Sequence, residues 1–183
     1  MQVAHVRVVA LGGDVILASR RKGERHRVEI EAAAGVAHLV VLDFEGAEVL
    51  TPSYFFGSLW FLWERQHVEQ CSVLVNVPEP SYDDVELVTK LKRTPIWAAR
   101  YPASTITSPT LLGDLETTDS FALEQVFNLG SVSASEMAVA DDVLSVTGWN
   151  NRLAGLWQKK VLTRRRHGRM FRYALPWRSE ENG

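Results

Sequence analysis

The sequence contains one cysteine, Cys71, so an intrachain disulfide is excluded. Proteins without disulfides are typical of the cytoplasm, where thiols stay reduced. Cys71 precedes the mainly apolar segment 73–77, a setting that predicts a small buried hydrophobic side chain rather than a reactive thiol. We therefore expect a cytoplasmic protein that is stabilised by its hydrophobic core.

The sequence also lacks the features of a membrane protein. The uncharged apolar stretch Val49–Trp63 is shorter than the about 20 residues that a bilayer-spanning helix needs. The first ten residues alternate in polarity and carry His5 and Arg7, which no signal peptide would place there. We expect a soluble chain without a membrane partner.

A strong overall charge is missing as well, since the formal net charge is -2. The distribution is uneven, however. Residues 1–118 contain 11 basic and 15 acidic residues, whereas the segment from Val143 to Arg178 contains nine basic residues and no acidic one. The composition argues against a uniformly basic surface and predicts a local positive field near the C-terminus.

Motifs for catalysis or for metal binding are absent from the sequence. It has neither a phosphate-binding P-loop nor a GxGxxG motif. Glu64, His67 and Cys71 have helical spacing, but a fourth ligand is missing, so we predict no metal site. Four other histidines are scattered along the chain: His5, His26, His38 and His167. We expect neither an enzyme nor a cofactor.

The first half of the chain predicts several strands. Residues 3–10 alternate in polarity, and residues 15–18 form a second short apolar segment after a Gly-Gly-Asp turn. The polar stretch Ser19–His26 is interpreted as a loop, and Val28–Ala34 as a strand or a short helix. The continuous apolar run from His38 to Leu42 is typical of a central strand covered on both faces.

Helices and strands are then expected to alternate. Thr51 and Pro52 are a favourable start for a helix that extends to about Gln66. A strand at residues 72–77, an amphipathic helix at 83–93 and a strand at 95–101 complete the order β-β-β-α-β-α-β. This order predicts an α/β or α+β domain with a mixed sheet over residues 1–102. The Ser-, Thr- and Pro-rich residues 103–118 are interpreted as a linker.

The segment Leu39–Glu64 resembles the STAS superfamily, the fold of anti-sigma factor antagonists, and more closely a STAS-like family of unknown function. The resemblance depends on the strand 39–43, Gly46, the segment Leu50–Ser53 and a following helix that contains Gly57. It implies a protein-interaction module that binds a partner or forms a homodimer. The apolar density of the helix fits plain core packing equally well.

The same resemblance marks Ser53 and Thr51 as candidate phosphorylation sites. Ser53 is at the position of the serine that a kinase phosphorylates in antagonists, but Thr51, Pro52 and Tyr54 depart from the Asp-Ser-Ser-Gly motif. A phosphate at a helix N-terminus would be stabilised by free N–H groups. The alternative, which the residues favour, is that both hydroxyls only satisfy the end of the helix.

The C-terminal residues 119–177 predict three helices and a β-hairpin, followed by a tail at 178–183. The first helix begins at Asp119 or Ser120, and a Ser133–Glu136 capping box opens the second, at 134–140. Thr147 is expected to cap the third helix, which extends to about Lys160. Two strands, 161–166 and 169–175, flank a turn at residues 167–168.

The span Ser120–Leu175 resembles the winged helix-turn-helix superfamily of prokaryotic regulators. The matching positions are Leu153, Leu156, Val161, Leu162 and Tyr173. The resemblance implies that helix 146–160 enters the major groove of double-stranded DNA, while the hairpin, called the wing, touches phosphate or the minor groove.

Ten residues are candidates for contact with DNA because amides and arginines can read base edges and cations neutralise phosphates. They are Thr147, Asn150, Asn151, Arg152, Lys159, Arg164, Arg165, Arg166, His167 and Arg169. Two alternatives remain open for the same residues. The wing charges are also a common device against edge-to-edge aggregation, and many winged helices bind protein.

The sequence therefore predicts a DNA-binding transcriptional regulator or a DNA-tethering adaptor, with a STAS-like domain for dimerisation or partner binding. The alternative function is a protein–protein adaptor in a kinase or ATPase partner-switching or multi-subunit system, without direct reading of DNA.

Overall fold

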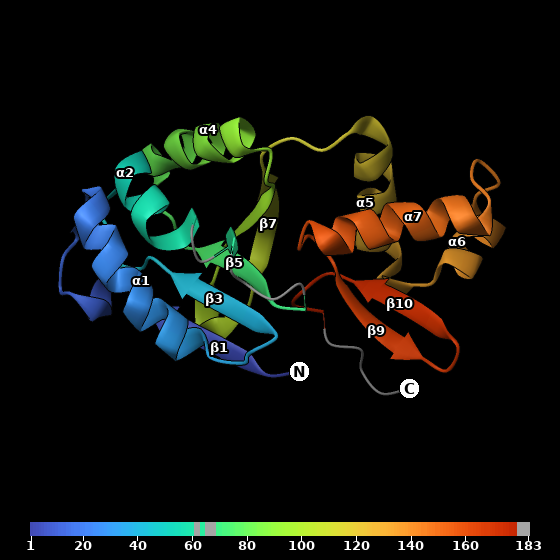
Figure 1. Cartoon of the computed structure of the whole chain (residues 1–183), viewed down its shortest axis with the longest axis horizontal. Helices are drawn as coiled ribbons and strands as arrows, with labels where there is room; N and C mark the ends of the chain where they lie inside the picture. The colour runs from blue at the N-terminus through green and yellow to red at the C-terminus, as the bar shows by residue number, and fades with distance from the viewer. Residues whose placement is uncertain (61–62, 65–68, 179–183) are drawn as a thin grey trace. The chain divides into compact units, whose positions relative to one another are not determined.

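The computed structural model describes residues 1–60, 63–64 and 69–178. The chain divides into two compact units, an N-terminal unit of residues 1–114 and a C-terminal unit of residues 115–183 (Figure 1). No helix in the described ranges combines the length and the hydrophobicity needed to cross a bilayer.

The N-terminal unit is built on a mixed five-stranded sheet with the strand order β1-β3-β5-β6-β7. The strands are β1 (Val3–Arg7), β3 (Leu39–Asp43), β5 (Cys71–Val75), β6 (Ile96–Arg100) and β7 (Thr107–Leu112). The first four run parallel, and β7 pairs with β6 in the antiparallel direction. A separate pair of short parallel strands joins β2 (Ile16–Leu17) to β4 (Val49–Leu50). The expected α/β class with a mixed sheet is confirmed.

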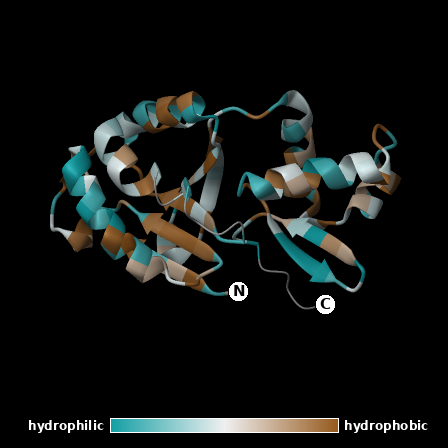
Figure 2. Ribbon diagram, in the orientation of Figure 1, coloured by the Kyte–Doolittle hydropathy of each residue, from teal (hydrophilic) through white to brown (hydrophobic). Residues whose placement is uncertain are grey.

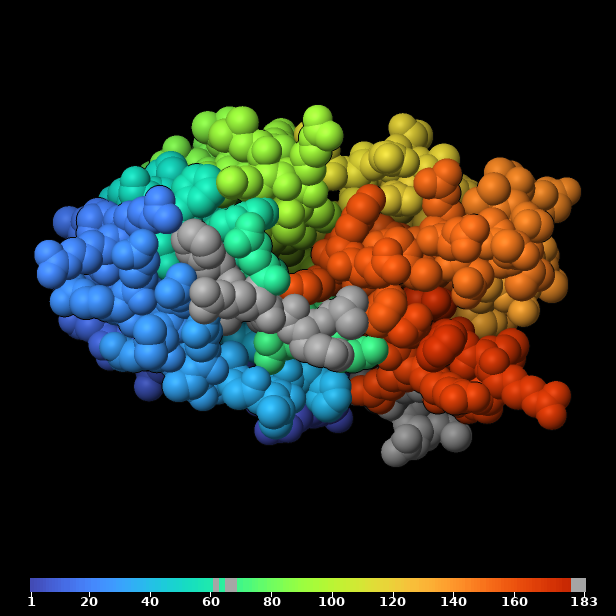
Figure 3. All heavy atoms as spheres, in the orientation of Figure 1, coloured from blue at the N-terminus to red at the C-terminus, as the bar shows by residue number. Residues whose placement is uncertain are grey.

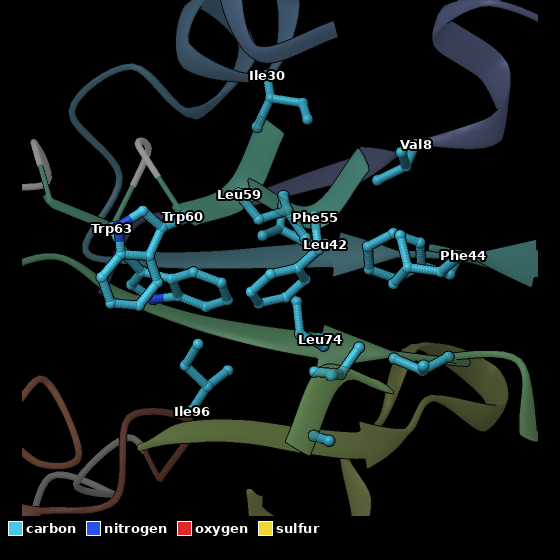
Figure 4. Packing of buried hydrophobic residues seen from close by; sticks show 14 of the residues in the cluster. Val8, Ile30, Leu42, Phe44, Phe55, Leu59, Trp60, Trp63, Leu74 and Ile96 are labelled. Atoms are coloured by element: carbon cyan, nitrogen blue, oxygen red, sulfur yellow. The ribbon is translucent and has the colours of Figure 1, made fainter. Parts of the chain in front are cut away.

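One hydrophobic cluster joins the sheet of this unit to its helices. The helices are α1 (Arg20–Ala34), α2 (Pro52–Phe55) and α4 (Tyr82–Lys92). Alternate residues of the strands contribute to the cluster, for example Leu42 of β3 and Leu74 of β5. The helices contribute Ile30, Phe55 and Val85, and all five side chains are buried. Figure 4 shows part of this cluster. Because alternate residues of a strand point to opposite faces, these helices all pack on one face of the sheet.

Helix α1 corrects one expectation for the N-terminal unit and decides another in favour of a helix. Residues 20–26, expected as a loop, form its first turns, and residues 28–34 continue the same helix. Ser19 caps the helix by accepting from the Lys22 N–H. The buried positions include Gly23, His26 and Ile30 at helical spacing. Because Gly23 and His26 are not large apolar residues, the buried side of α1 does not appear in the sequence as a hydrophobic repeat at helical spacing.

Glycines allow α1 to approach α2 and the π-helical segment Phe56–Trp60 closely. A methyl group on Gly23 would lie 2.5 Å from the carbonyl oxygen of Tyr54, and one on Gly57 would clash with the carbonyl oxygen of Arg20. His26 Nδ1 lies 2.8 Å from the hydroxyl of Tyr54 inside this contact. Burial lowers the pKa of the His26 imidazole and raises the pKa of the Tyr54 hydroxyl.

The helix expected from Thr51 to about Gln66 is helical at the described residues 52–60 and 63–64, but it is not a regular α-helix throughout. Thr51 caps α2 as predicted, accepting from the Tyr54 N–H, but the chain widens into the π-helical turn after four residues. Ser58 donates its hydroxyl to the carbonyl of Tyr54, a back-bond that is common where a helix departs from regular geometry. Residues 61–62 and 65–68 lie outside the described ranges.

The expected linker at residues 103–118 contains the fifth strand instead. Residues 107–112 form β7, and the boundary between the units falls between Asp114 and Leu115. Thr-rich sequence is compatible with a strand, and Pro109 is tolerated because β7 is at the edge of the sheet. Composition alone gave the wrong interpretation here.

The C-terminal unit has the element order α-β-α-α-β-β. Its elements are α5 (Thr117–Leu129), β8 (Ser131–Val132), α6 (Ala134–Ala140), α7 (Val146–Gln158), β9 (Thr163–His167) and β10 (Met170–Ala174). The three strands form an antiparallel sheet with β10 in the middle. The hairpin and the three helices agree with the sequence prediction, whereas β8 was not predicted, because two residues are too short for a pattern.

Caps define the ends of these helices. The Ser133–Glu136 capping box is confirmed by both of its hydrogen bonds. The predicted caps of the other two helices are wrong: Glu116 occupies the cap position of α5, and Ser145 caps α7 by accepting from the Gly148 N–H. The capping hydroxyl therefore comes two residues earlier than predicted, so α7 begins at Val146 and Thr147 lies inside the helix.

Candidate nucleic-acid interface

Helix α7 has one buried face, which fixes the face that it exposes. The buried side chains are Trp149, Leu153, Leu156 and Trp157. They follow the helical period, as the sequence predicted. Trp149 and Leu153 are completely buried, so the helix cannot rotate about its axis without exposing the core.

The opposite face of α7 is an uncharged polar stripe. It comprises Thr147, Asn150, Asn151, Ala154 and Gln158, which share one side of a helix by their spacing. All are exposed except the half-buried Ala154. We call this set the α7 stripe. Gln158 was not among the sequence candidates, although its spacing of seven from Asn151 placed it on the same face.

Arg152 and Lys159 do not belong to this stripe. Both contact Asp119 of α5, whose side chain is buried: Lys159 Nζ lies 2.6 Å from Asp119 Oδ2, and Arg152 Nη1 lies 3.4 Å from Asp119 Oδ1. Arg152 also lies 3.6 Å from Glu116. These two predicted DNA contacts are therefore engaged in ion pairs within the unit.

Arg164 packs inside the unit too. Its guanidinium lies 3.4 Å from the ring centre of Trp157 and 4.3 Å from that of Phe171, so it contacts two aromatic side chains. Burial raises the pKa of the neighbouring Tyr173 hydroxyl, while the charge of Arg164 opposes that shift. We assign Arg164 mainly to packing between α7 and the wing.

The remaining wing candidates are exposed at the end of the hairpin. They are Arg165, Arg166, His167 and Arg169. Within residues 1–60, 63–64 and 69–178, no carboxylate forms an ion pair with the three arginines, and Arg166 donates only to the carbonyl of Gly168. Strand β9 is hydrophilic along its length (Figure 2), and the end of the hairpin stands out from the unit (Figure 3).

Arg172, the cross-strand neighbour of Arg165, is held by other elements. Its Nη1 donates to Glu136 of the capping box at 2.8 Å, and its Nη2 donates to the carbonyl of Ser131 at 2.7 Å. Burial raises the pKa of the Glu136 carboxyl, but the Ser133 N–H and Arg172 outweigh it and hold that pKa below its ordinary value. Arg172 thus ties α6 and β8 to β10.

The turn that precedes α7 has a different surface. Asp141 and Asp142 lie in it, and the large apolar side chains of Val139, Val143 and Val146 are exposed around it. Two carboxylates close to the start of α7 repel other anions, so this turn is unfavourable for a phosphate group. The three exposed valines add apolar surface beside these carboxylates.

The candidate phosphorylation sites lie in the N-terminal unit. Thr51 is occupied, since its hydroxyl accepts from Tyr54 and donates to the carbonyl of Leu17. Ser53 is exposed on α2, a helix of only four residues. The structure thus gives Thr51 a capping role and leaves Ser53 accessible.

A buried carboxylate connects three parallel strands. Asp43 at the end of β3 accepts from Asn76 Nδ2 at 2.8 Å and from the Glu45 N–H, and it lies 2.9 Å from His5 Nε2 of β1. Both of its oxygens have partners, so it stabilises the strand ends. Groups of three side chains able to bind a metal are not found in the part of the chain that the structure describes, from which His67 is missing.

Comparison of the chain with protein-family models, curated proteins and solved structures finds no match.

Proposed function

We propose that this protein binds double-stranded DNA through its C-terminal unit, as a transcriptional regulator or a DNA-tethering adaptor. The order α5-β8-α6-α7-β9-β10 agrees with the winged helix-turn-helix resemblance of residues 120–175. In that arrangement α7 is the helix that enters the major groove, and the β9–β10 hairpin is the wing.

The observation that carries the proposal is the division of chemistry between two surfaces of one unit. The α7 stripe presents three amide side chains without any charge, whereas the wing presents Arg165, Arg166 and Arg169 without ion-pair partners in the described chain. Phosphate contacts position a protein on a duplex, and base contacts specify the sequence. A cationic wing beside a polar helix face supplies both kinds of contact.

A gel-shift titration of the full chain with random-sequence duplex DNA over a salt series tests this function. We expect binding at low salt that weakens steeply as salt rises, because each neutralised phosphate releases a counterion. Unmeasurable binding at low salt would refute the proposal.

We propose that the N-terminal unit is a STAS-like domain that dimerises or binds a partner. Its mixed sheet with helices on one face is compatible with that resemblance. Light scattering of the full chain after size-exclusion chromatography measures its mass, and a dimer is the expected result. A monomer that also fails to bind any kinase or ATPase of the same genome would contradict this part.

A second candidate function is protein docking through the C-terminal unit. It is favoured by Val139, Val143 and Val146, which are exposed next to Asp141 and Asp142. This adaptor would bind no duplex at low salt. A partner protein held there would be released by Val143→Ser, but not by Arg166→Ala, and the opposite result would exclude docking at this turn.

A further inference from the structure

We infer that α7 reads adenine–thymine base pairs through the major-groove edge. The inference rests on the proposed DNA-binding function and names the class of sequence that the site would select. It comes from the composition of the α7 stripe, all of which lies within the described residues.

The amide side chains of the stripe match adenine. Asn150, Asn151 and Gln158 each carry a donor and an acceptor on one planar group. Adenine presents an N6 donor beside an N7 acceptor in the major groove, so an amide can form two hydrogen bonds with it. Asn151 and Gln158 are two helical turns apart, which lets them meet different base pairs.

The other two members of the stripe match thymine. Thr147 and Ala154 each present a methyl group on the same side of the helix as the amides. Thymine is the base with a methyl group on its major-groove edge, and alanine and threonine methyls are among the groups that contact it. Amides for adenine and methyls for thymine thus alternate along one surface.

Side chains that read guanine are missing from the stripe. Guanine is recognised chiefly by arginine or lysine, which donate to its O6 and N7. The two cations that α7 and its C-cap carry nearest this surface, Arg152 and Lys159, are held by Asp119. The exposed arginines at positions 165, 166 and 169 belong to the wing and not to α7.

Base analogues separate the two grooves and test the inference. Four duplexes share their length and flanks and differ in a core of A·T, G·C, diaminopurine·T or inosine·C pairs. The diaminopurine·T pair keeps the major-groove edge of A·T and has the minor groove of G·C, and inosine·C has the reverse combination. We expect the full chain to bind the A·T and diaminopurine·T duplexes at least about fivefold more tightly than the other two.

Variants assign that preference to the stripe. Asn151→Ala and Gln158→Ala should each reduce the preference, since each removes an amide from an exposed position where the fold does not need it. Arg165→Ala is the matched control, and it should weaken binding to all four duplexes by the same factor.

Each other outcome has one meaning. Salt-dependent binding that is equal for all four duplexes overturns the inference and leaves the proposed function standing. A preference for the A·T and inosine·C duplexes would mean that the protein recognises the minor groove, and this result also overturns the inference. Absence of binding to every duplex at low salt overturns the proposed function itself.

Discussion

The ammonium of Lys159 lies 2.6 Å from the carboxylate of Asp119, which is buried although it is charged. Arg152 approaches the other oxygen of the same carboxylate, so one acid on α5 holds two cations from α7 and its C-cap. Buried charges persist in proteins when they are paired in this way. The two cations therefore stabilise the C-terminal unit.

Asp119→Ala is expected to destabilise the unit by about 1–3 kcal/mol, less than for a fully buried pair because both cations are partly exposed. Arg152→Ala should also lower the free energy of unfolding, while the affinity of the folded protein for DNA changes by less than about twofold. Urea denaturation and gel shifts measure the two quantities. The control is Gln158→Ala, which should leave stability within about 0.5 kcal/mol. A loss of DNA affinity in a fully folded Arg152→Ala protein would restore its role as a base reader.

Removing the wing charges is expected to weaken DNA binding without unfolding the protein. The triple variant Arg165→Ala, Arg166→Ala, Arg169→Ala loses three exposed cations, so the slope of log affinity against log salt should become shallower by roughly 2–3. A charge-matched control replaces Arg20, Arg21 and Arg25, which are exposed on α1. If the control loses as much affinity as the wing variant, the attraction is due to overall charge rather than to the wing.

Gly57→Ala should destabilise the N-terminal unit by about 1–3 kcal/mol, because the added methyl group would clash with the backbone of α1. The opposite sign is expected for Gly155→Ala in α7. A methyl group there meets nothing within 4 Å, and alanine is the better helix former by about 1 kcal/mol. Thermal or urea unfolding distinguishes the two, and a neutral Gly57→Ala would mean that α1 and the π-helical segment separate easily.

Stability should decrease in mild acid because of His26. Burial lowers the pKa of its imidazole from the ordinary 6.5, so the unfolded chain binds more protons than the folded chain between the two pKa values. This contribution is complete above pH 6.5 and is lost as the pH falls through the folded pKa. Urea midpoints at pH 7.5 and pH 5 should differ less in His26→Gln than in the parent chain; an equal difference would assign the acid effect to other groups.

The features predicted correctly from the sequence were those determined by residues close together in the chain. The capping box from Ser133 to Glu136 lies within four residues, and the turn of the hairpin needs only Gly168, whose φ of 60° is unfavourable for other residues. The α7 core face was visible because four large apolar residues repeat at helical spacing. Each of these features depends on neighbours in the chain.

Features that depend on distant partners were not predictable in this way. The buried side of α1 uses Gly23 and His26, whose roles depend on Tyr54 and the π-helical segment. The pairing of Arg152 with Asp119 spans 33 positions, so the sequence assigned that arginine to DNA. Strand β7 was concealed because its Thr- and Pro-rich composition is also that of a linker.

Strand β10 follows β8 and β9 in the sequence, yet it is the middle strand of their sheet. During synthesis, β8 and β9 leave the ribosome before the strand that must lie between them. Until Met170–Ala174 has emerged, β8 has no hydrogen-bonded neighbour in this sheet and β9 presents an unpaired edge. Nascent chains that are released before this point would carry two strands that both lack their neighbour in this sheet, and they should be prone to aggregation and to recognition by chaperones.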